Sequence, residues 1–269
     1  MRMTDVDMGQ LALACELLET KPLAMRLCDA LGLPIETALS LLPQKAKDKI
    51  NSITQDCLRK AQNVALQTLG DKPRRKASDI FHKGCVTAGG FVGGLGGLAG
   101  LAVEAPISTV VMLRSIADIA RSQGALLDDP EVRLECLKVF ALSGGTRLDG
   151  AVPGYYAIRT LLSQNLPEIA ALLAVRGISD EAGTLLGRFT ATIAERFSLR
   201  LSEKFAAQSV PLLGAVGGAT VNYIFIGHFQ DVARGHFIVR RLEALYGEEP
   251  VRRAYQRIRQ GSCSTEETN

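Results

Sequence analysis

Residues 84–103 form a run of twenty uncharged residues, and eight of the twenty are glycine. Several of the glycines recur at four-residue spacing, including Gly89, Gly93 and Gly97. On a helix this spacing lines the glycines along one stripe, which lets another backbone approach closely. Each glycine inside a helix also costs about 1 kcal/mol relative to alanine. The run therefore predicts helices that are held in place by tertiary packing or by a membrane.

A second uncharged run covers residues 205–230 and contains Pro211, Gly214 and Gly218. Pro211 predicts the start of a helix or a kink, and the two glycines predict close helix packing. The pattern G-x-x-G-G occurs here at 214–218 and also at 93–97, which suggests two related helical halves.

Both runs are long enough to cross a bilayer, for which about 20 residues suffice. Their composition opposes this reading, because glycine adds almost no hydrophobicity and the second run contains Gln208, Asn222 and His228. We expect both runs to lie in the core of a compact helical domain that meets a membrane only peripherally. Insertion of either run into the membrane remains the alternative.

The rest of the chain also shows helical periodicity, so the predicted fold class is all-α and multi-helical. Helices are expected over 9–42 with turns, 44–69, Pro106 to about Gly124, 130–142, 155–163, 167–175, 180–206, and from Asp231 to Gly247 and then Gln260. The predicted organisation is a loosely packed N-terminal helical region over residues 1–70, a main helical domain over 71–260, and a disordered tail over 261–269.

Composition excludes several classes of protein. The chain has 31 Lys and Arg against 28 Asp and Glu, a balance of +3 that is too small for a dedicated DNA-binding protein. Aromatic residues make up 5% and tryptophan is absent, which argues against stacking platforms for single-stranded nucleic acid. The six cysteines include no C-x-x-C pair, so we expect free thiols. The first residues lack the apolar run of a signal peptide, which predicts a cytoplasmic location.

Motifs for catalysis or cofactors are weak. Residues 94–99 fit the dinucleotide pattern G-x-G-x-x-A, followed by Asp118, but no credible strand precedes them, so glycine packing is favoured. The chain has three histidines, His82, His228 and His236, for which a capping or surface role is favoured over a metal site. We expect no catalytic residue, no metal and no cofactor.

Two sets of polar residues remain as candidates for other roles. Asn222 lies inside the second apolar run, so if buried it must find hydrogen-bond partners, and a structural role between helices is favoured. Basic helices follow that run, and their arginines either form a solvated face or contact an anionic surface. These arginines are Arg234, Arg240, Arg241, Arg252, Arg253 and Arg257.

Three segments resemble the bacterial EcsC family. They are EKFAAQSVPLLGAVGGATVNYIF (203–225), ARGHFIVRRLEALYG (233–247) and GGFVGGLGGLAGLAVEAPISTVVMLRSIADIARSQG (89–124), and the resemblance covers roughly residues 80–250. The founding member is encoded beside two components of an ABC transporter linked to protein secretion. The resemblance implies no catalytic residue and no cofactor.

The sequence therefore predicts a non-catalytic accessory protein at the cytoplasmic face of the membrane, with a membrane surface or a membrane-protein subunit as partner and no nucleic acid. By resemblance, this accessory role would support an ABC transporter or secretion. Two alternatives stay open, a carrier of lipids or small molecules and a hydrolase. The sequence predicts no oligomeric state.

Overall fold

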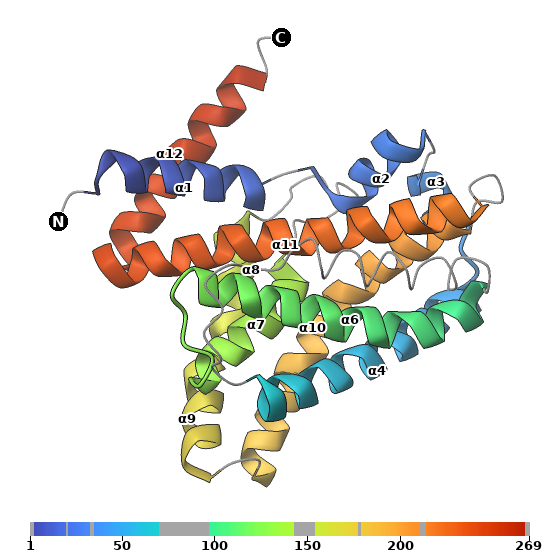
Figure 1. The fold of residues 1–269 in the computed structure, drawn as a ribbon, viewed down its shortest axis with the longest axis horizontal. Coiled ribbons are helices and arrows are strands. Elements are labelled where there is room, and N and C mark those ends of the chain that lie inside the picture. The colour runs from blue at the N-terminus through green and yellow to red at the C-terminus, as the bar shows by residue number, and fades with distance from the viewer. Residues whose placement is uncertain are drawn as a thin grey trace.

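The computed structural model describes residues 3–19, 21–32, 35–69, 97–142, 154–176, 179–209 and 214–266. These residues contain eleven helices and no strand, which confirms the all-α prediction (Figure 1). The helices are α1 (Asp5–Leu18), α2 (Leu23–Leu31), α3 (Ile35–Ser40), α4 (Gln44–Thr68), α6 (Gly97–Ser122), α7 (Pro130–Leu142), α8 (Tyr155–Ser163), α9 (Leu166–Arg176), α10 (Asp180–Gln208), α11 (Gly214–Tyr246) and α12 (Glu248–Glu266).

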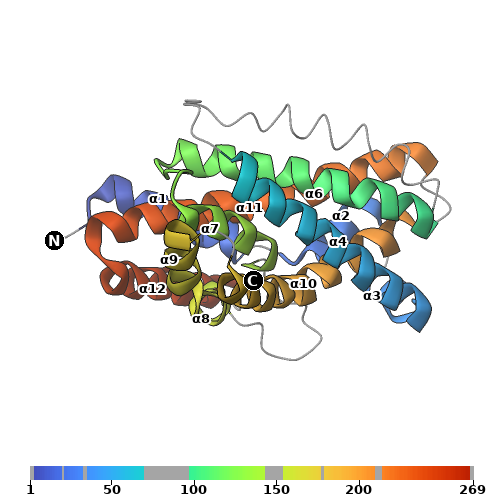
Figure 2. The same cartoon turned by 90° about the horizontal axis from the view of Figure 1, so that it is seen from below.

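Helix α11 is the longest helix of the described chain and lies at its centre. Helices α1 and α12 pack on one side of α11 and α6 packs on the opposite side in Figure 1, and Figure 2 again places α6 and α12 on opposite sides of α11. Val221, Phe225 and Phe229 on α11 are completely buried. Most of the described apolar residues of the second uncharged run are therefore core, although Tyr223 is 53% exposed.

The N-terminal helices belong to the same core as the rest of the chain. Helix α4 packs on α6 and α10, and α1 packs on α11. Leu11, Leu27 and Ile50 are all completely buried, and they join one continuous apolar cluster with residues of α6, α10 and α11. The expectation of a loosely packed N-terminal region is therefore wrong for its described residues.

A glycine explains how α1 comes so close to α11. A Cβ atom added to Gly235 would lie 2.7 Å from Cγ of Leu18 and 3.1 Å from the backbone oxygen of Ala14. Only glycine leaves α1 this room. The sequence predicted close helix approach at other glycines and overlooked this one, because Gly235 stands alone rather than in a four-residue repeat.

Two helix boundaries differ from the predicted ones. Helix α6 begins at Gly97 and contains Pro106 in its interior, where the sequence predicted the helix to start at this proline. Proline removes one helical hydrogen bond, but the packing of the surrounding turns on α4 and α11 keeps the helix intact. Helix α12 continues to Glu266, so the predicted disordered tail is helical over 261–266, since extending an anchored helix adds a hydrogen bond per residue.

Candidate functional site

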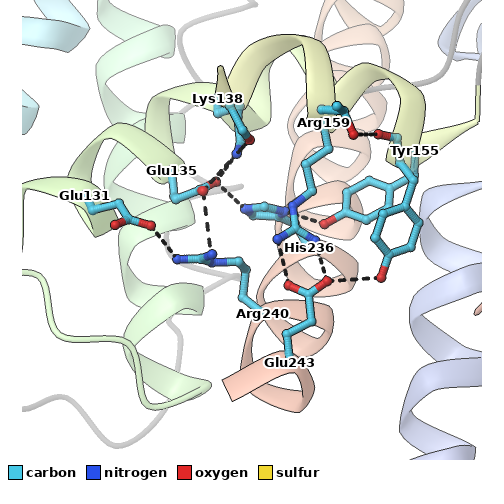
Figure 3. A network of polar contacts seen from close by, with 11 residues as sticks. Glu131, Glu135, Lys138, Tyr155, Arg159, His236, Arg240 and Glu243 are labelled. Carbon is cyan, nitrogen blue, oxygen red and sulfur yellow. Dashed lines mark hydrogen bonds and ion pairs between the residues drawn. The ribbon is translucent and has the colours of Figure 1, made fainter. Parts of the chain in front are cut away.

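The polar residues of α7, α8 and α11 converge in a buried charged network (Figure 3). Helix α7 contributes residues 131, 135 and 138, and α11 contributes residues 236, 240 and 243, so both use the spacing i, i+4, i+7 that places side chains on one helix face. Helix α8 adds two residues that are four positions apart. The charged network consists of Glu131, Glu135, Lys138, Tyr155, Arg159, His236, Arg240 and Glu243.

Glu135 is the centre of the charged network. Its Oε2 atom lies 2.7 Å from Nζ of Lys138 and 2.8 Å from Nε2 of His236. Lys138 and His236 are completely buried and Glu135 is 2% exposed. Burial alone would raise the pKa of Glu135, but the charge of Lys138 and the hydrogen bond from His236 outweigh it and hold this pKa well below its usual value. Glu135 is therefore an ionised carboxylate in the core.

His236 joins Glu135 to Tyr155. Burial lowers the pKa of His236 to about 4, although its hydrogen bond to Glu135 acts in the opposite direction. The imidazole is therefore neutral at neutral pH, and Nε2 donates to the Glu135 carboxylate. Its Nδ1 atom accepts from the hydroxyl of Tyr155, at 2.8 Å. The structure thus corrects the expectation of a surface or capping role for this histidine.

The outer part of the network holds α8 against α11. Arg159 donates from Nη1 and Nη2 to the two carboxylate oxygens of Glu243, each at 2.6 Å. This bidentate geometry is among the strongest that an ion pair adopts. Arg240 donates to Glu131 at 2.8 Å. Within the network as defined, three carboxylates therefore face three cations, and their charges balance.

The order Tyr155, His236, Glu135 is that of a hydroxyl, an imidazole and a carboxylate in a catalytic triad. A nucleophile must reach its substrate, and Tyr155 is 2% exposed, with its ring against Tyr156 and Tyr255. Burial also raises the pKa of Tyr155, which keeps the hydroxyl protonated. The arrangement therefore joins three helices and presents no nucleophile to solvent.

A second buried ion pair joins α6 to α10. Nζ of Lys204 lies 2.7 Å from Oε2 of Glu104, and the lysine is completely buried. Nδ2 of Asn222 donates to Oε1 of Glu104 at 3.3 Å, so Asn222 links α11 to the same pair. The ammonium group of Lys204 also lies 5.0 Å from the centre of the Phe225 ring.

His228 is the other histidine that the sequence misplaced. It is 2% exposed on α11, and neither ring nitrogen has a hydrogen-bond partner within the described part of the chain. Burial and the nearby charges of Arg200 and Arg26 hold its pKa well below the usual value, so His228 is neutral. In the residues that the structure describes, no three histidine, cysteine or acidic side chains gather as metal ligands would.

Only some of the residues predicted for close helix packing are described by the structure. Gly89, Gly93 and Pro211 lie outside the described residues, whereas Gly97, Gly214 and Gly218 lie within them. Gly97 begins α6 with a φ of 55°, a conformation that favours glycine, and nothing lies within 4 Å of an added Cβ. Gly214 is the first residue of α11, and Gly218 is buried one turn later.

The dinucleotide pattern does not meet its structural requirement. Gly97 and Asp118 lie in the same helix, 21 residues apart, which corresponds to about 32 Å. Asp118 is 5% exposed and pairs with Arg121 at 2.6 Å. A ribose-binding acid lies instead at the end of a neighbouring strand, close to the glycine turn.

Four of the six candidate arginines are engaged in contacts within the protein. On α11, Arg234 pairs with Asp231 and Arg240 pairs with Glu131, while Arg241 is half-buried. On α12, Arg253 pairs with Glu249 at 2.9 Å, Arg252 lies over the Tyr156 ring, and Arg257 is exposed. Because α12 and α6 lie on opposite sides of α11, the basic helix α12 does not adjoin the apolar run of α6 (Figure 2). Contact of these arginines with an anionic surface stays a prediction.

Helix α6 carries an apolar stripe on its outer face. Val103 is 68% exposed and Ile107, one turn later, is 64% exposed. Val110 continues the stripe and Arg114 ends it. Of the helices in the described ranges, α6 alone is long and apolar enough to cross a membrane, but 56% of its most apolar window is buried in the protein. Most of α6 is thus core, and its outer stripe is exposed in the described structure.

Sequence reasoning missed the charged network. The signal was present in the i, i+4, i+7 spacing of charged residues within otherwise apolar helices, at 131, 135, 138 and at 236, 240, 243. Such spacing is usually that of a solvated face, and only the packing of α7 against α11 turns these faces inward. Free thiols at Cys15, Cys28, Cys57 and Cys136 agree with the prediction for these four cysteines.

Comparison with known proteins identifies a family and no individual relative. The sequence model of the EcsC protein family matches residues 23–242, which is more than four fifths of the chain. No curated protein matches the chain. No solved structure matches it either.

Proposed function

The chain belongs to the EcsC protein family, and on this premise we propose that it is a non-catalytic accessory protein that binds the cytoplasmic face of a membrane. The observation that carries the proposal is the exposed stripe of Val103 and Ile107 on a helix whose other face is core. Exposed apolar side chains one turn apart favour contact with lipid or with another apolar surface.

The contact is peripheral in this proposal. The inner face of α6 packs on α4 and α11, and its buried Glu104 is paired with Lys204 of α10. Withdrawal of α6 into a bilayer would leave Lys204 without its partner and expose the apolar faces of α4 and α11. Only the outer stripe is free to meet the membrane without unfolding the core.

The alternative partner for the same apolar stripe is a subunit of a membrane protein. The resemblance to a family whose founding member is encoded beside an ABC transporter supports a transporter or secretion component as the partner. Such a partner would bury the stripe more completely than lipid does, since well-packed interfaces exclude water from their centre.

Liposome flotation tests the proposal. We expect wild-type protein to float with vesicles that contain anionic lipid, and Ile107→Glu to lose most of this binding because it places a charge in the stripe. Leu126→Glu, which changes an equally exposed leucine outside the stripe (67% exposed), is the matched control and should bind like wild type.

Native membrane vesicles separate the two forms of contact. Stronger binding to native vesicles than to protein-free liposomes, with the same dependence on Ile107, supports a protein partner. Equal binding of wild type and Ile107→Glu to both kinds of vesicle would overturn the proposal.

A further inference from the structure

Helix α12 has the residue pattern of a helix that lies in a membrane surface. Val251, Ala254, Tyr255 and Ile258 stand at positions i, i+3, i+4 and i+7, which places them on one helix face. The segment from 250 to 260 has no acidic residue, and its arginines lie outside this apolar face. They are Arg252, Arg253, Arg257 and Arg259. An apolar face bordered by arginines favours the interface of an anionic membrane, and the contact proposed for α6 gives this pattern no role.

In the folded protein, the apolar face of α12 covers only a small surface. The helix packs on α1 and α11, and the ring of Tyr255 lies against Tyr155 of α8. Val251, Ala254 and Tyr255 are buried, but every residue from 256 to 261 is half-buried or exposed. Figure 1 shows the C-terminal end of α12 extending past α1, beyond the other helices. An element with so few buried apolar side chains opens at a lower free energy than the core does.

One carboxylate, which we call the latch, holds α12 on the protein. It belongs to Glu19, directly after α1, and it accepts a hydrogen bond from the hydroxyl of Tyr255 at 3.0 Å. Its other oxygen lies 3.3 Å from Nε of Arg259. Glu19 also accepts from the backbone N–H of Tyr155 at 3.2 Å, a bond that does not involve α12. The latch therefore keeps one partner when α12 leaves.

Departure of α12 strands no member of the charged network. All residues of that network lie on α7, α8 and α11. Arg253 pairs with Glu249 inside α12 itself. Departure of α6, in contrast, would leave the buried Lys204 without Glu104. Of these two helices, α12 is the one that can exchange its contacts without opening the core.

Gly247 is the pivot for this exchange. It joins α11 to α12 with a φ of 86°, and glycine adopts other backbone angles at little cost. Departure uncovers the rings of Tyr155 and Tyr156, against which Tyr255 packs. Lipid around the apolar face of α12 offsets part of this cost, and anionic headgroups attract its arginines.

We propose that α12 is a detachable helix, which the latch holds on the protein and which an anionic membrane binds instead, with its apolar face in the lipid interface. The docked form predominates away from membranes, because only this form contains the bonds of the latch to α12. The device is separate from the stripe of α6, since α6 and α12 lie on opposite sides of α11 (Figure 2). While the latch is closed, the stripe carries most of the wild-type binding.

A single tryptophan reports the position of α12, because the chain has none of its own. Ile258→Trp places it on the apolar face, and Gln256→Trp, the matched control, places it on the exposed face. Each full-length variant is mixed with vesicles of phosphatidylglycerol and brominated phosphatidylcholine, which quenches tryptophan in the acyl region. Detachment predicts strong quenching of Ile258→Trp and weak quenching of Gln256→Trp. A docked helix that touches lipid with its outer face predicts the reverse order.

Tyr255→Phe tests the latch, because it removes a hydrogen bond to a carboxylate that exists only in the docked form. The test is made in the Ile258→Trp protein that also carries Ile107→Glu, so that the stripe of α6 does not contribute. Tyr255→Phe should lower the lipid concentration for half-maximal quenching by about tenfold. Tyr246→Phe is the matched control, since this hydroxyl donates to Asp7 of α1 rather than to α12, and it should leave that concentration unchanged.

A change of charge gives an independent test of the latch. Glu19→Gln and Glu16→Gln remove the same charge from the same part of the chain, but Glu16 is exposed on α1. Only Glu19→Gln weakens the contact with Arg259, so it should promote quenching more than Glu16→Gln does. Circular dichroism checks that each variant is folded.

Three results would overturn the proposal. They are quenching of Ile258→Trp that does not exceed that of Gln256→Trp, equal effects of Tyr255→Phe and Tyr246→Phe, and equal effects of the two glutamate variants. Because the latch is tested without the stripe of α6, failure of this device and failure of the proposed contact of α6 are separate outcomes.

Discussion

Gly187 and Gly235 both lie inside long helices, but their surroundings differ. Gly187→Ala meets open space and gains helix propensity, so it should stabilise the protein by about 0.5–1 kcal/mol. Gly235→Ala places a methyl group 2.7 Å from Leu18 and should destabilise it by about 1–3 kcal/mol. Urea unfolding of both variants checks the prediction, and a change of the same sign at the two positions would contradict it.

Lys204 illustrates what a buried charge costs when its partner is removed. Lys204→Met leaves Glu104 ionisable in the core, which should destabilise the fold by about 3–5 kcal/mol. The double variant Lys204→Met with Glu104→Leu should recover much of the loss, because no charge is then stranded. Chemical denaturation measures both. Lys21→Met, in an exposed pair with Asp29, is the control and should change stability little, and an equal effect at the two lysines would refute the argument.

At the scale of the element, α8 depends on polar contacts. Tyr155 bonds to His236, Arg159 bonds to Glu243, and Ser163 at its end accepts from Lys138 at 2.8 Å. These contacts join a nine-residue helix to α7 and α11. Since isolated helices of this length are unstable in water, α8 depends on tertiary contacts, and the charged network stabilises it together with its buried Ile158 and Leu162.

The protonation of His236 makes this order depend on pH. The unfolded chain binds a proton on this histidine near pH 6.5 and the folded chain only near pH 4, so the unfolded state binds more protons between these values. Stability should therefore fall by about 3 kcal/mol as pH drops from 6.5 to 4. Further loss follows as the pH falls toward the low pKa of Glu135, whose stabilising effect as a carboxylate then disappears.

His236→Gln tests this assignment, because glutamine keeps a donor and an acceptor but does not titrate. Denaturation curves at several pH values should show a shallower loss of stability for the variant than for wild type over pH 6.5 to 4. Parallel pH profiles would mean that His236 does not carry the effect.

At the scale of the molecule, the sequence was sufficient for the helices and insufficient for their contacts. Apolar periodicity and turn signals predicted α4, α7, α8 and α10 to within one or two residues. It failed at Pro106, because proline is normally read as a helix start and only tertiary packing keeps it inside α6.

For the candidate sites, too, the sequence indicated local features but not the partners that the fold brings together. A buried role was foreseen for Asn222 as a polar residue inside an apolar run, but its partner Glu104 is 118 positions away and no local pattern joins the two. The partners of His236 lie on two other helices, at Tyr155 and Glu135. Contacts between segments that are distant in the sequence depend on how the helices pack. The spacing of residues along a single sequence does not reveal which distant residues will meet.

Fractionation of cells at native protein level tests the central claim most directly, that α6 is a core helix with a peripheral membrane contact. Membranes are washed first with high salt and then with alkaline carbonate. The account predicts that the wild-type protein is found on membranes and is released by these washes, and that Ile107→Glu remains in the soluble fraction from the start. Wild-type protein that resists carbonate would show that the helix is inserted, and wild-type protein that never sediments with membranes would contradict the membrane contact itself.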